Sequence, residues 1–459
     1  MTPAMRVLKY WVLGAALGAW FALGGLPSAA LAEVPTNRPY GLESRPPAKA
    51  YLGMPAHAED RIPARISETG LFKDVRRMLP VDELIPYDLV VPFWSDHAAK
   101  FRWISVPTGE AIQYSRTGEW IFPVGTVFVK SFELTTDETR PGTARRLETR
   151  VLVRDESGGV YGVTYKWRPD NSDADLMDSS LTETVTIKTA AGERSQPWYY
   201  PTREDCRTCH TSHAGFVLGV KTRQLNRDLG FPSGVADNQL RAWSHAGMFT
   251  AKLAESDLAN APKLARLDDP AHSLEERAHS YLDANCAHCH RPGGTVADFD
   301  LRFDTPLARQ KVVGASVLID QGIDHARVIA PNDIWRSILF MRTNTVEPFK
   351  MPPLARNTVD EAGMALLRAW IESMPGLPVL PPPEISPRGG TFERAVTVSM
   401  KTEAGATIRF TLDGSNPTAS DPVYEQPIPL MGPTIFRARS YRAGSVESIP
   451  AQEIFIVSE

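Results

Sequence analysis

The chain has 459 residues, with 50 basic and 54 acidic side chains and a net charge of −4 at pH 7. A balance this close to neutral argues against the strongly basic surface that nucleic-acid binding needs, so no nucleic-acid partner is expected. The length exceeds what a single hydrophobic core usually supports, and we expect roughly three domains.

Residues 1–32 have the three parts of a secretory signal peptide. Arg6 and Lys9 give a positive start, residues 10–26 form an apolar core, and residues 30–32 offer small side chains for cleavage. An uncleaved membrane anchor is the alternative, but glycine and proline at the end of the apolar core favour cleavage. We therefore expect a periplasmic or secreted protein.

Residues 33–200 are predicted to form an extended arm followed by an all-β domain. The arm is rich in proline, alanine and charge and shows little periodicity. After it, β-branched and aromatic runs are separated by glycines, which is typical of antiparallel strands joined by turns. The clearest predicted strands are residues 101–106, 126–132 and 150–153.

The sequence Cys-x-x-Cys-His occurs twice and uses all four cysteines of the chain. This spacing lets two thiols on one turn bond the two vinyl groups of a haem, while the imidazole that follows binds the iron. We therefore predict two covalently attached haem c groups. The residues that would bind them are Cys206, Cys209 and His210 in the first motif and Cys286, Cys289 and His290 in the second. A zinc site made of four cysteines is the alternative.

Residues 201–267 are predicted to form a small first haem module, with short helical pieces at 218–226 and 238–243. No Met-Pro loop follows the first motif, so the sequence does not identify the second axial ligand of its iron. Met248 and His245 are the main protein candidates, and His213 lies too near His210 in the sequence to reach the opposite face easily. An iron with an open or water-bound position is the remaining alternative.

Residues 268–375 have the pattern of a second module. Ser273 and Glu276 form a capping box that opens a helix leading to the second motif. The loop Lys350-Met351-Pro352-Pro353 then precedes another helix, whose one apolar face consists of Met364, Leu367, Trp370 and Ile371.

The order of helix, Cys-x-x-Cys-His, helices, Met-Pro loop and terminal helix resembles class I cytochrome c over residues 268–375. The resemblance implies an all-α domain, with His290 as the proximal ligand and Met351 as the distal ligand of the second iron. A thioether ligand favours ferrous iron and raises the reduction potential.

Residues 376–383 form a stiff proline-rich linker, and residues 384–459 are predicted to be a small β-sandwich. Strands are expected at residues 395–400, 406–412 and 434–441 because apolar and polar side chains alternate there.

Within this last segment, Phe410–Thr418, Tyr424 and Ala438–Ser440 resemble the C-terminal β-sandwich module of chitobiase and related glycosidases. The resemblance spans residues 385–457. It implies an accessory module without catalytic residues, which either contacts carbohydrate or serves as a spacer.

Residues 91–100, 122–126, 206–226 and 284–286 resemble a bacterial family of exported dihaem c-type cytochromes. The sequence thus predicts a multidomain protein with an N-terminal all-β domain, two haem modules, the second of them all-α, and a C-terminal β-sandwich. Two functions stay open. The first is electron transfer between redox proteins of the cell envelope, with no catalytic residue; the alternative is a dihaem oxidoreductase, a peroxidase or oxidase with an open first iron.

Overall fold

The computed structural model describes residues 39–458, so the predicted signal peptide lies outside the described residues. Over this range the chain forms nineteen β-strands and eight α-helices, and the helices are short. From Tyr40 onward, the described residues make up one compact unit. The protein is therefore mostly β.

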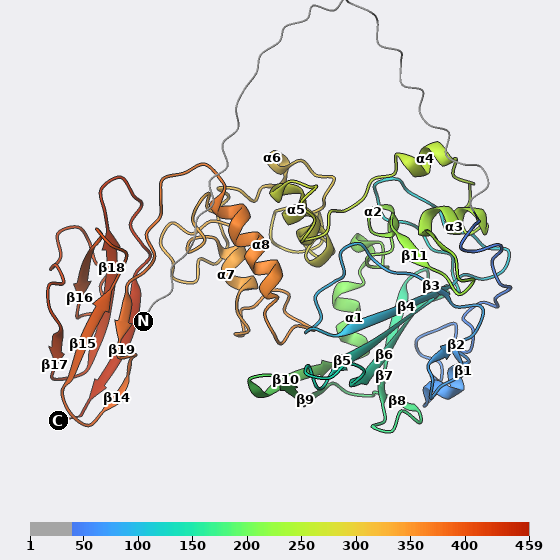
Figure 1. Cartoon of the computed structure of the whole chain (residues 1–459), viewed down its shortest axis with the longest axis horizontal. Coiled ribbons are helices and arrows are strands. Elements are labelled where there is room, and N and C mark those ends of the chain that lie inside the picture. Colours follow the sequence, from blue (N-terminus) through green and yellow to red (C-terminus); the bar gives the residue numbers. More distant parts are fainter. Residues whose placement is uncertain (1–38, 459) are drawn as a thin grey trace, which may run out of the picture. The chain divides into compact units, whose positions relative to one another are not determined.

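A six-stranded antiparallel sheet dominates the N-terminal half (Figure 1). Its inward face packs on a core that contains Val127, Val129, Val151 and Val153, while its other face turns toward the first Cys-x-x-Cys-His motif. The predicted strands of this domain are confirmed. In spatial order the sheet consists of β3 (Ile85–Pro86), β4 (Ala99–Ser105), β5 (Val127–Thr135), β6 (Ala144–Arg154), β7 (Val160–Trp167) and β8 (Ala174–Leu176).

Three two-stranded sheets precede or follow the strands of this sheet along the chain. They consist of β1 (Phe72–Asp74) with β2 (Leu79–Pro80), β9 (Leu181–Thr189) with β10 (Gly192–Tyr200), and β11 (Asp228–Gly230) with β12 (Ala236–Asn238). Two 3-10 turns, η1 and η2, lie at Ile66–Thr69 and Ser212–Ala214.

Short helices follow the sheet and carry the first motif. They are α1 (Arg203–Cys209), α2 (Thr222–Leu225), α3 (Gln239–His245) and α4 (Glu255–Ala259). The helical pieces predicted at 218–226 and 238–243 correspond to α2 and α3.

The prediction of an all-α cytochrome c domain over residues 268–375 is wrong. This segment contains only α5 (Leu274–Asn285), α6 (Leu307–Gln310), α7 (Ile338–Thr343) and α8 (Glu361–Glu372). Between α5 and α7 the chain is irregular, with isolated β-bridges such as Val313 to Ile329 and Ser316 to Arg327. Glycines and prolines recur along residues 292–331, and they prevent the long helices that the resemblance implied.

The two helices predicted most sharply in this segment do form. Ser273 Oγ accepts a hydrogen bond from Glu276 N at 3.2 Å, and the Glu276 carboxylate accepts one from Ser273 N at 3.0 Å, so the capping box opens α5 as expected. The apolar face of α8 is buried, and Leu367 and Trp370 belong to the same core as Tyr281 of α5.

The C-terminal segment is a β-module of two sheets with its own core, which includes Val398, Phe436 and Phe455. This part of the prediction is confirmed. One sheet has the order β13-β15-β17 and the other β14-β19-β18-β16; the strands are β13 (Glu384–Ser386), β14 (Gly390–Phe392), β15 (Val396–Lys401), β16 (Thr407–Thr411), β17 (Ile428–Leu430), β18 (Thr434–Tyr441) and β19 (Ala451–Val457).

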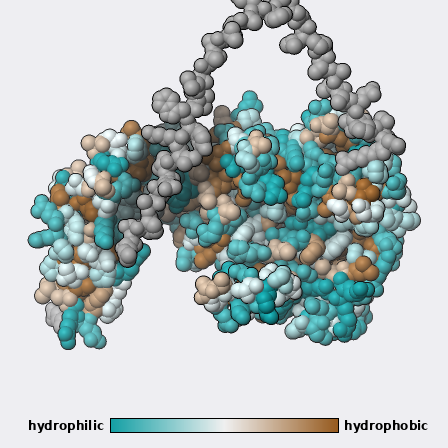
Figure 2. All heavy atoms as spheres, viewed as in Figure 1, coloured by the Kyte–Doolittle hydropathy of each residue, from teal (hydrophilic) through white to brown (hydrophobic). Residues whose placement is uncertain are grey.

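On the face that Figure 2 shows, apolar side chains stand in small groups among polar ones.

The longest helices, α5 and α8, have 12 residues each. Within residues 39–458, no helix has both the length and the apolar character that crossing a membrane requires.

Candidate haem-binding site

The first motif begins on α1, and the local sequence explains why this helix starts where it does. Thr202 Oγ1 accepts a hydrogen bond from Asp205 N at 3.2 Å, and Asp205 accepts one from Thr202 N at 2.8 Å, so the two residues form a capping box. A Cβ atom at Gly162 of β7 would stand only 2.7 Å from the sulfur of Cys206. The glycine thus lets α1 lie directly against the sheet.

His210 caps the C-terminal end of α1 with its ring already oriented. Its Nδ1 lies 2.7 Å from the carbonyl oxygen of Phe216 and donates a hydrogen bond to it, which leaves Nε2 with a free lone pair. Burial, with a contribution from the charges of Lys130 and His288, lowers the pKa of His210 to about 4. The ring is therefore neutral at pH 7, and this is the form that binds a metal.

A cavity of about 210 Å³ adjoins the first motif. Cys206, Cys209 and His210 form one side of it, and the six-stranded sheet forms another. The main wall residues are, from the sheet, Phe128, Lys130, Arg150, Leu152 and Gly162; from the loop before β4, Phe93 and Trp94; from the second motif and its helix, Asn285 and His288; and from the loop before α8, Pro352, Leu354 and Arg356. Two thiols and an oriented imidazole at the edge of this cavity are the groups that attach and bind a haem c, although the cavity itself is smaller than a haem.

The second motif follows α5 and is supported differently. Cys286 is the C-cap of that helix, and His290 N donates to the Cys286 carbonyl oxygen at 2.9 Å. The His290 ring stacks on Phe299, with ring centroids 4.4 Å apart, and its buried Nδ1 has no hydrogen-bond partner among the described residues. Burial lowers the pKa of His290 to about 4, so this ring is neutral too. Two cysteines and a neutral histidine are the groups that a second haem c would need. Cys286, Cys289 and His290 do not line the cavity of the first motif.

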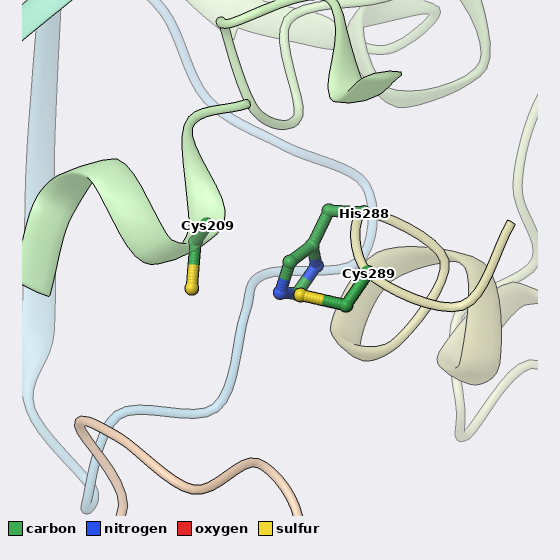
Figure 3. A group of neighbouring side chains, drawn as sticks. All are labelled: Cys209, His288 and Cys289. Carbon is green, nitrogen blue, oxygen red and sulfur yellow. The ribbon is translucent and has the colours of Figure 1, made fainter. Parts of the chain in front are cut away.

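The structure brings the two motifs into contact. The sulfurs of Cys209 and Cys289 and a ring nitrogen of His288 all lie within 4.8 Å of one another, with Cys209 at the end of α1 and the other two on the turn after α5 (Figure 3). A hydrogen bond between the two thiols raises the pKa of Cys209 and lowers that of Cys289. Cys206 and Cys286 are not part of this group, so the structure brings one cysteine of each motif, together with His288, around one point.

Buried polar contacts hold the second motif against the first half of the chain. Arg291, directly after His290, donates to the His213 carbonyl oxygen at 3.0 Å and to Glu119 at 2.8 Å. Lys221 and Asp283 form a buried ion pair at 2.7 Å. The closeness of the motifs is thus fixed by several independent contacts.

Met351 lies on a loop that approaches both motifs. Its N–H donates to the Arg342 carbonyl oxygen at 2.8 Å, and the charge of Arg342 contributes to the lowered pKa of His290, after burial. The next residues of the same loop, Pro352 and Leu354, line the cavity of the first motif, whereas Met351 does not.

Asp96 anchors this loop to the N-terminal domain. The Asp96 side chain is buried and accepts hydrogen bonds from Asn357 N and Thr358 N, each at 2.8 Å, and from the Thr358 hydroxyl at 2.9 Å. Two residues earlier, Trp94 N donates to the side chain of Asn285, next to the second motif, at 2.8 Å.

Met248 and His245, the sequence-based candidates for the second ligand of the first iron, do not line the cavity. Met248 is fully buried in an aromatic cluster with Trp120, Trp243 and Phe249. The His245 ring stacks on Tyr40, with centroids 3.5 Å apart.

Lys130, Arg150 and His288 also line the cavity, and none of them was predicted as a site residue. One signal was available for the first of them. In Phe128-Val129-Lys130-Ser131-Phe132 the lysine shares a strand face with two phenylalanines, which is an unusual place for a charge.

Comparison with protein families identifies one segment of the chain. Residues 387–451 match the chitobiase/beta-hexosaminidase C-terminal domain, and this confirms the resemblance found for residues 385–457. No curated protein and no solved structure matches the chain. The C-terminal β-module is therefore similar to the accessory domain of those glycosidases.

Proposed function

We propose that the protein is an exported dihaem c-type cytochrome that transfers electrons between redox proteins in the periplasm or outside the cell. The observation that supports this proposal best is the placement of Cys209 and Cys289, whose sulfurs lie within 4.8 Å of each other. Porphyrins bonded to these two sulfurs would meet at their edges, which is the arrangement that rapid electron exchange between haems needs.

Each haem supplies a one-electron couple when bound. The residues of the chain position each haem and shield it from water. The Phe216 carbonyl holds the His210 ring with Nε2 toward the cavity, and Phe128, Leu152 and Phe93 exclude water from it. Arg291 and Lys221 hold the second motif close to the first through their ion pairs.

The experiment is to produce the chain with a haem-maturation system and to measure haem per chain after acid denaturation. We expect two haems, two one-electron steps in a potentiometric titration, and magnetic coupling between the ferric irons in electron paramagnetic resonance. Stoichiometric zinc without haem would contradict the proposal, as would two haems that show no mutual influence in any of these signals.

The second candidate is a dihaem oxidoreductase, either a peroxidase or an oxidase, with an open first iron. The observation in its favour is that no methionine is among the residues that line the first cavity, although the imidazole of His288 is. Carbon monoxide and peroxide decide between the two: binding of either at one haem per chain favours the enzyme, and binding at neither haem favours the carrier.

For the C-terminal module we propose an accessory role that includes contact with carbohydrate, in line with the family that residues 387–451 match. Retention of the full chain, but not of a chain ending at Pro378, on insoluble polysaccharide would support this role. Equal retention of both would assign the module to spacing or stabilisation.

A further inference from the structure

Three cations lie side by side across the six-stranded sheet. Arg102 of β4 is paired in register with Lys130 of β5, and Lys130 is paired with Arg150 of β6. Residues paired in this way point to the same face of a sheet, and like charges directly opposite each other destabilise it. We call Arg102, Lys130 and Arg150 the cationic row.

The outer members of the cationic row have anionic partners, but the central one has none. Arg102 pairs with Asp88 at 2.7 Å, and Arg150 pairs with the fully buried Glu148 at 2.5 Å. Lys130 makes no hydrogen bond or ion pair with the described residues and only lies near the rings of Phe93 and Phe132, at 5.4 and 4.8 Å from their centroids.

These ring contacts are too weak to offset the position of Lys130. The Lys130 side chain is half-buried, and a cation over an aromatic ring gains less than an ammonium group loses where water is excluded from it. Burial and the neighbouring charges of Arg102 and Arg150 accordingly lower the pKa of Lys130 well below its ordinary value. Arg150 adds a buried Nε without an acceptor. Within the cationic row, Lys130 is thus the one member without an anion bonded to it among the described residues.

The missing anion has an accessible place, because Lys130 and Arg150 line the cavity of the first motif. The strand register locates them relative to the cysteines. Gly162, which touches Cys206, is paired with Leu152, and Leu152 with Phe128, so Cys206 lies over one row of side chains and Lys130 stands in the next row. Lys130 is also two strands away from Gly162, about 10 Å across the sheet.

We propose that Lys130 and Arg150 bind the propionate carboxylates of the haem that Cys206 and Cys209 attach. A haem c carries its two carboxylates on the edge opposite its thioether bonds, and Lys130 lies two strands and one row of side chains away from Gly162, against which Cys206 packs. Charge-assisted hydrogen bonds to a carboxylate would supply both the acceptor and the counter-charge that Lys130 lacks. The inference rests on the proposed function, since it requires the first haem.

The test is the reduction potential of each haem in the loaded protein for Lys130→Met, with Lys130→Arg as the conservative variant. Lys188→Met is the matched control, because Lys188 is exposed on β9 and has no side-chain partner among the described residues. A nearby cation stabilises the reduced haem. Lys130→Met should therefore shift the ferrous to ferric ratio of one haem about tenfold toward ferric, which is about 59 mV, while Lys130→Arg and Lys188→Met leave both potentials near their original values.

A second measurement covers the case in which Lys130→Met fails to mature. The resonance Raman propionate-bending band of the first haem should shift in Lys130→Arg and stay unchanged in Lys188→Met. Unchanged potentials and an unchanged band, with two haems present, would overturn the inference. Conversion of the first haem from low to high spin in Lys130→Met would overturn it as well, because Lys130 would then be an iron ligand. Absence of haem from the unmodified protein would instead refute the proposed function, and the inference with it.

Discussion

The two Cys-x-x-Cys-His motifs have the same sequence pattern but are supported by the fold in different ways. The first lies on a seven-residue helix against a rigid sheet, and the Phe216 carbonyl orients its histidine. The second follows the twelve-residue α5, and its histidine is held by stacking on Phe299, with Nδ1 unpartnered. A carbonyl partner on Nδ1 fixes both the tautomer and the ring direction, whereas stacking fixes only the ring plane.

This difference indicates that the first site is organised by the protein alone, while the second depends more on what binds there. It also indicates where the rest of the chain contributes. Strands and loops from the N-terminal domain build most of the first cavity, whereas the second motif relies on Arg291 and Lys221 to hold its place.

The largest expected effect comes from removing the thiols of one motif at a time. Cys286→Ala/Cys289→Ala should lose one haem and retain the other with an unchanged spectrum, because the first site does not need the second for its orientation. Cys206→Ala/Cys209→Ala should lose the other haem. Haem content and visible spectra after purification check both; a spectral change of the remaining haem in the first variant would show that the two sites depend equally on each other.

The next largest effect is expected on stability, from a change at Asp96, which anchors the loop after Met351 to the N-terminal domain. Asp96→Asn weakens the hydrogen bonds to Asn357 and Thr358, and hydrogen bonds to a charged group contribute about 1.5–3 kcal/mol. We expect a loss of about 2–3 kcal/mol in the free energy of unfolding, measured by denaturant titration. Asp82→Asn, at an exposed ion pair with Lys73, is the control and should stay within about 0.5 kcal/mol. Equal losses in both variants would mean that Asp96 is no anchor.

Met351→Ala distinguishes the two irons. If Met351 is the distal ligand of the second haem, its loss should abolish the weak near-infrared sulfur-to-iron band and lower the potential of that haem alone, because a soft donor that favours ferrous iron is removed. Met431→Ala, at a side chain that is 75% exposed, is the control. A band that survives Met351→Ala would exclude Met351 as a ligand.

Met248→Leu should have a smaller effect. Met248 fills the aromatic cluster around Trp120 and Trp243, so a substitution of similar volume should cost less than about 1.5 kcal/mol. The magnetic circular dichroism of the first haem should not change, since Met248 does not line the cavity. Loss of a low-spin signal there would make Met248 a ligand after all.

The smallest effect is expected from ending the chain at Pro378. The core of the C-terminal module contains only residues between Ile385 and Val457, and the contacts that truncation would remove, such as Arg439 with Asp324, lie outside the cavity of the first motif. Both haem spectra should therefore persist. Bleaching of either haem would make the module part of a haem pocket.

Local signals in the sequence predicted local structure well. The capping box at Ser273 and Glu276, the apolar face of α8 and the alternating strands of both β-regions all form where the residue pattern placed them. Each of these features depends on neighbours within one element, and periodicity and capping rules describe such neighbours directly.

The predictions that did not hold, or that the sequence could not make, depend on distant parts of the chain. The order of segments over 268–375 resembled an all-α domain, yet the turn-rich stretch between α5 and α7 does not form helices. The contact between Cys209 and Cys289, and the pairing of Lys130 with Arg102 and Arg150, arise from packing and strand register, which a single sequence does not specify.

The closeness of Cys209 and Cys289 also affects how the protein would be assembled. Both residues are free thiols in the structure, and they lie near enough for a modest movement to join them. In the oxidising compartment expected for an exported chain, a disulfide between them would take one attachment point from each haem at once. Maturation is then a competition between thioether formation and oxidation. A reductant that keeps Cys209 and Cys289 as thiols would therefore determine how much haem both motifs receive.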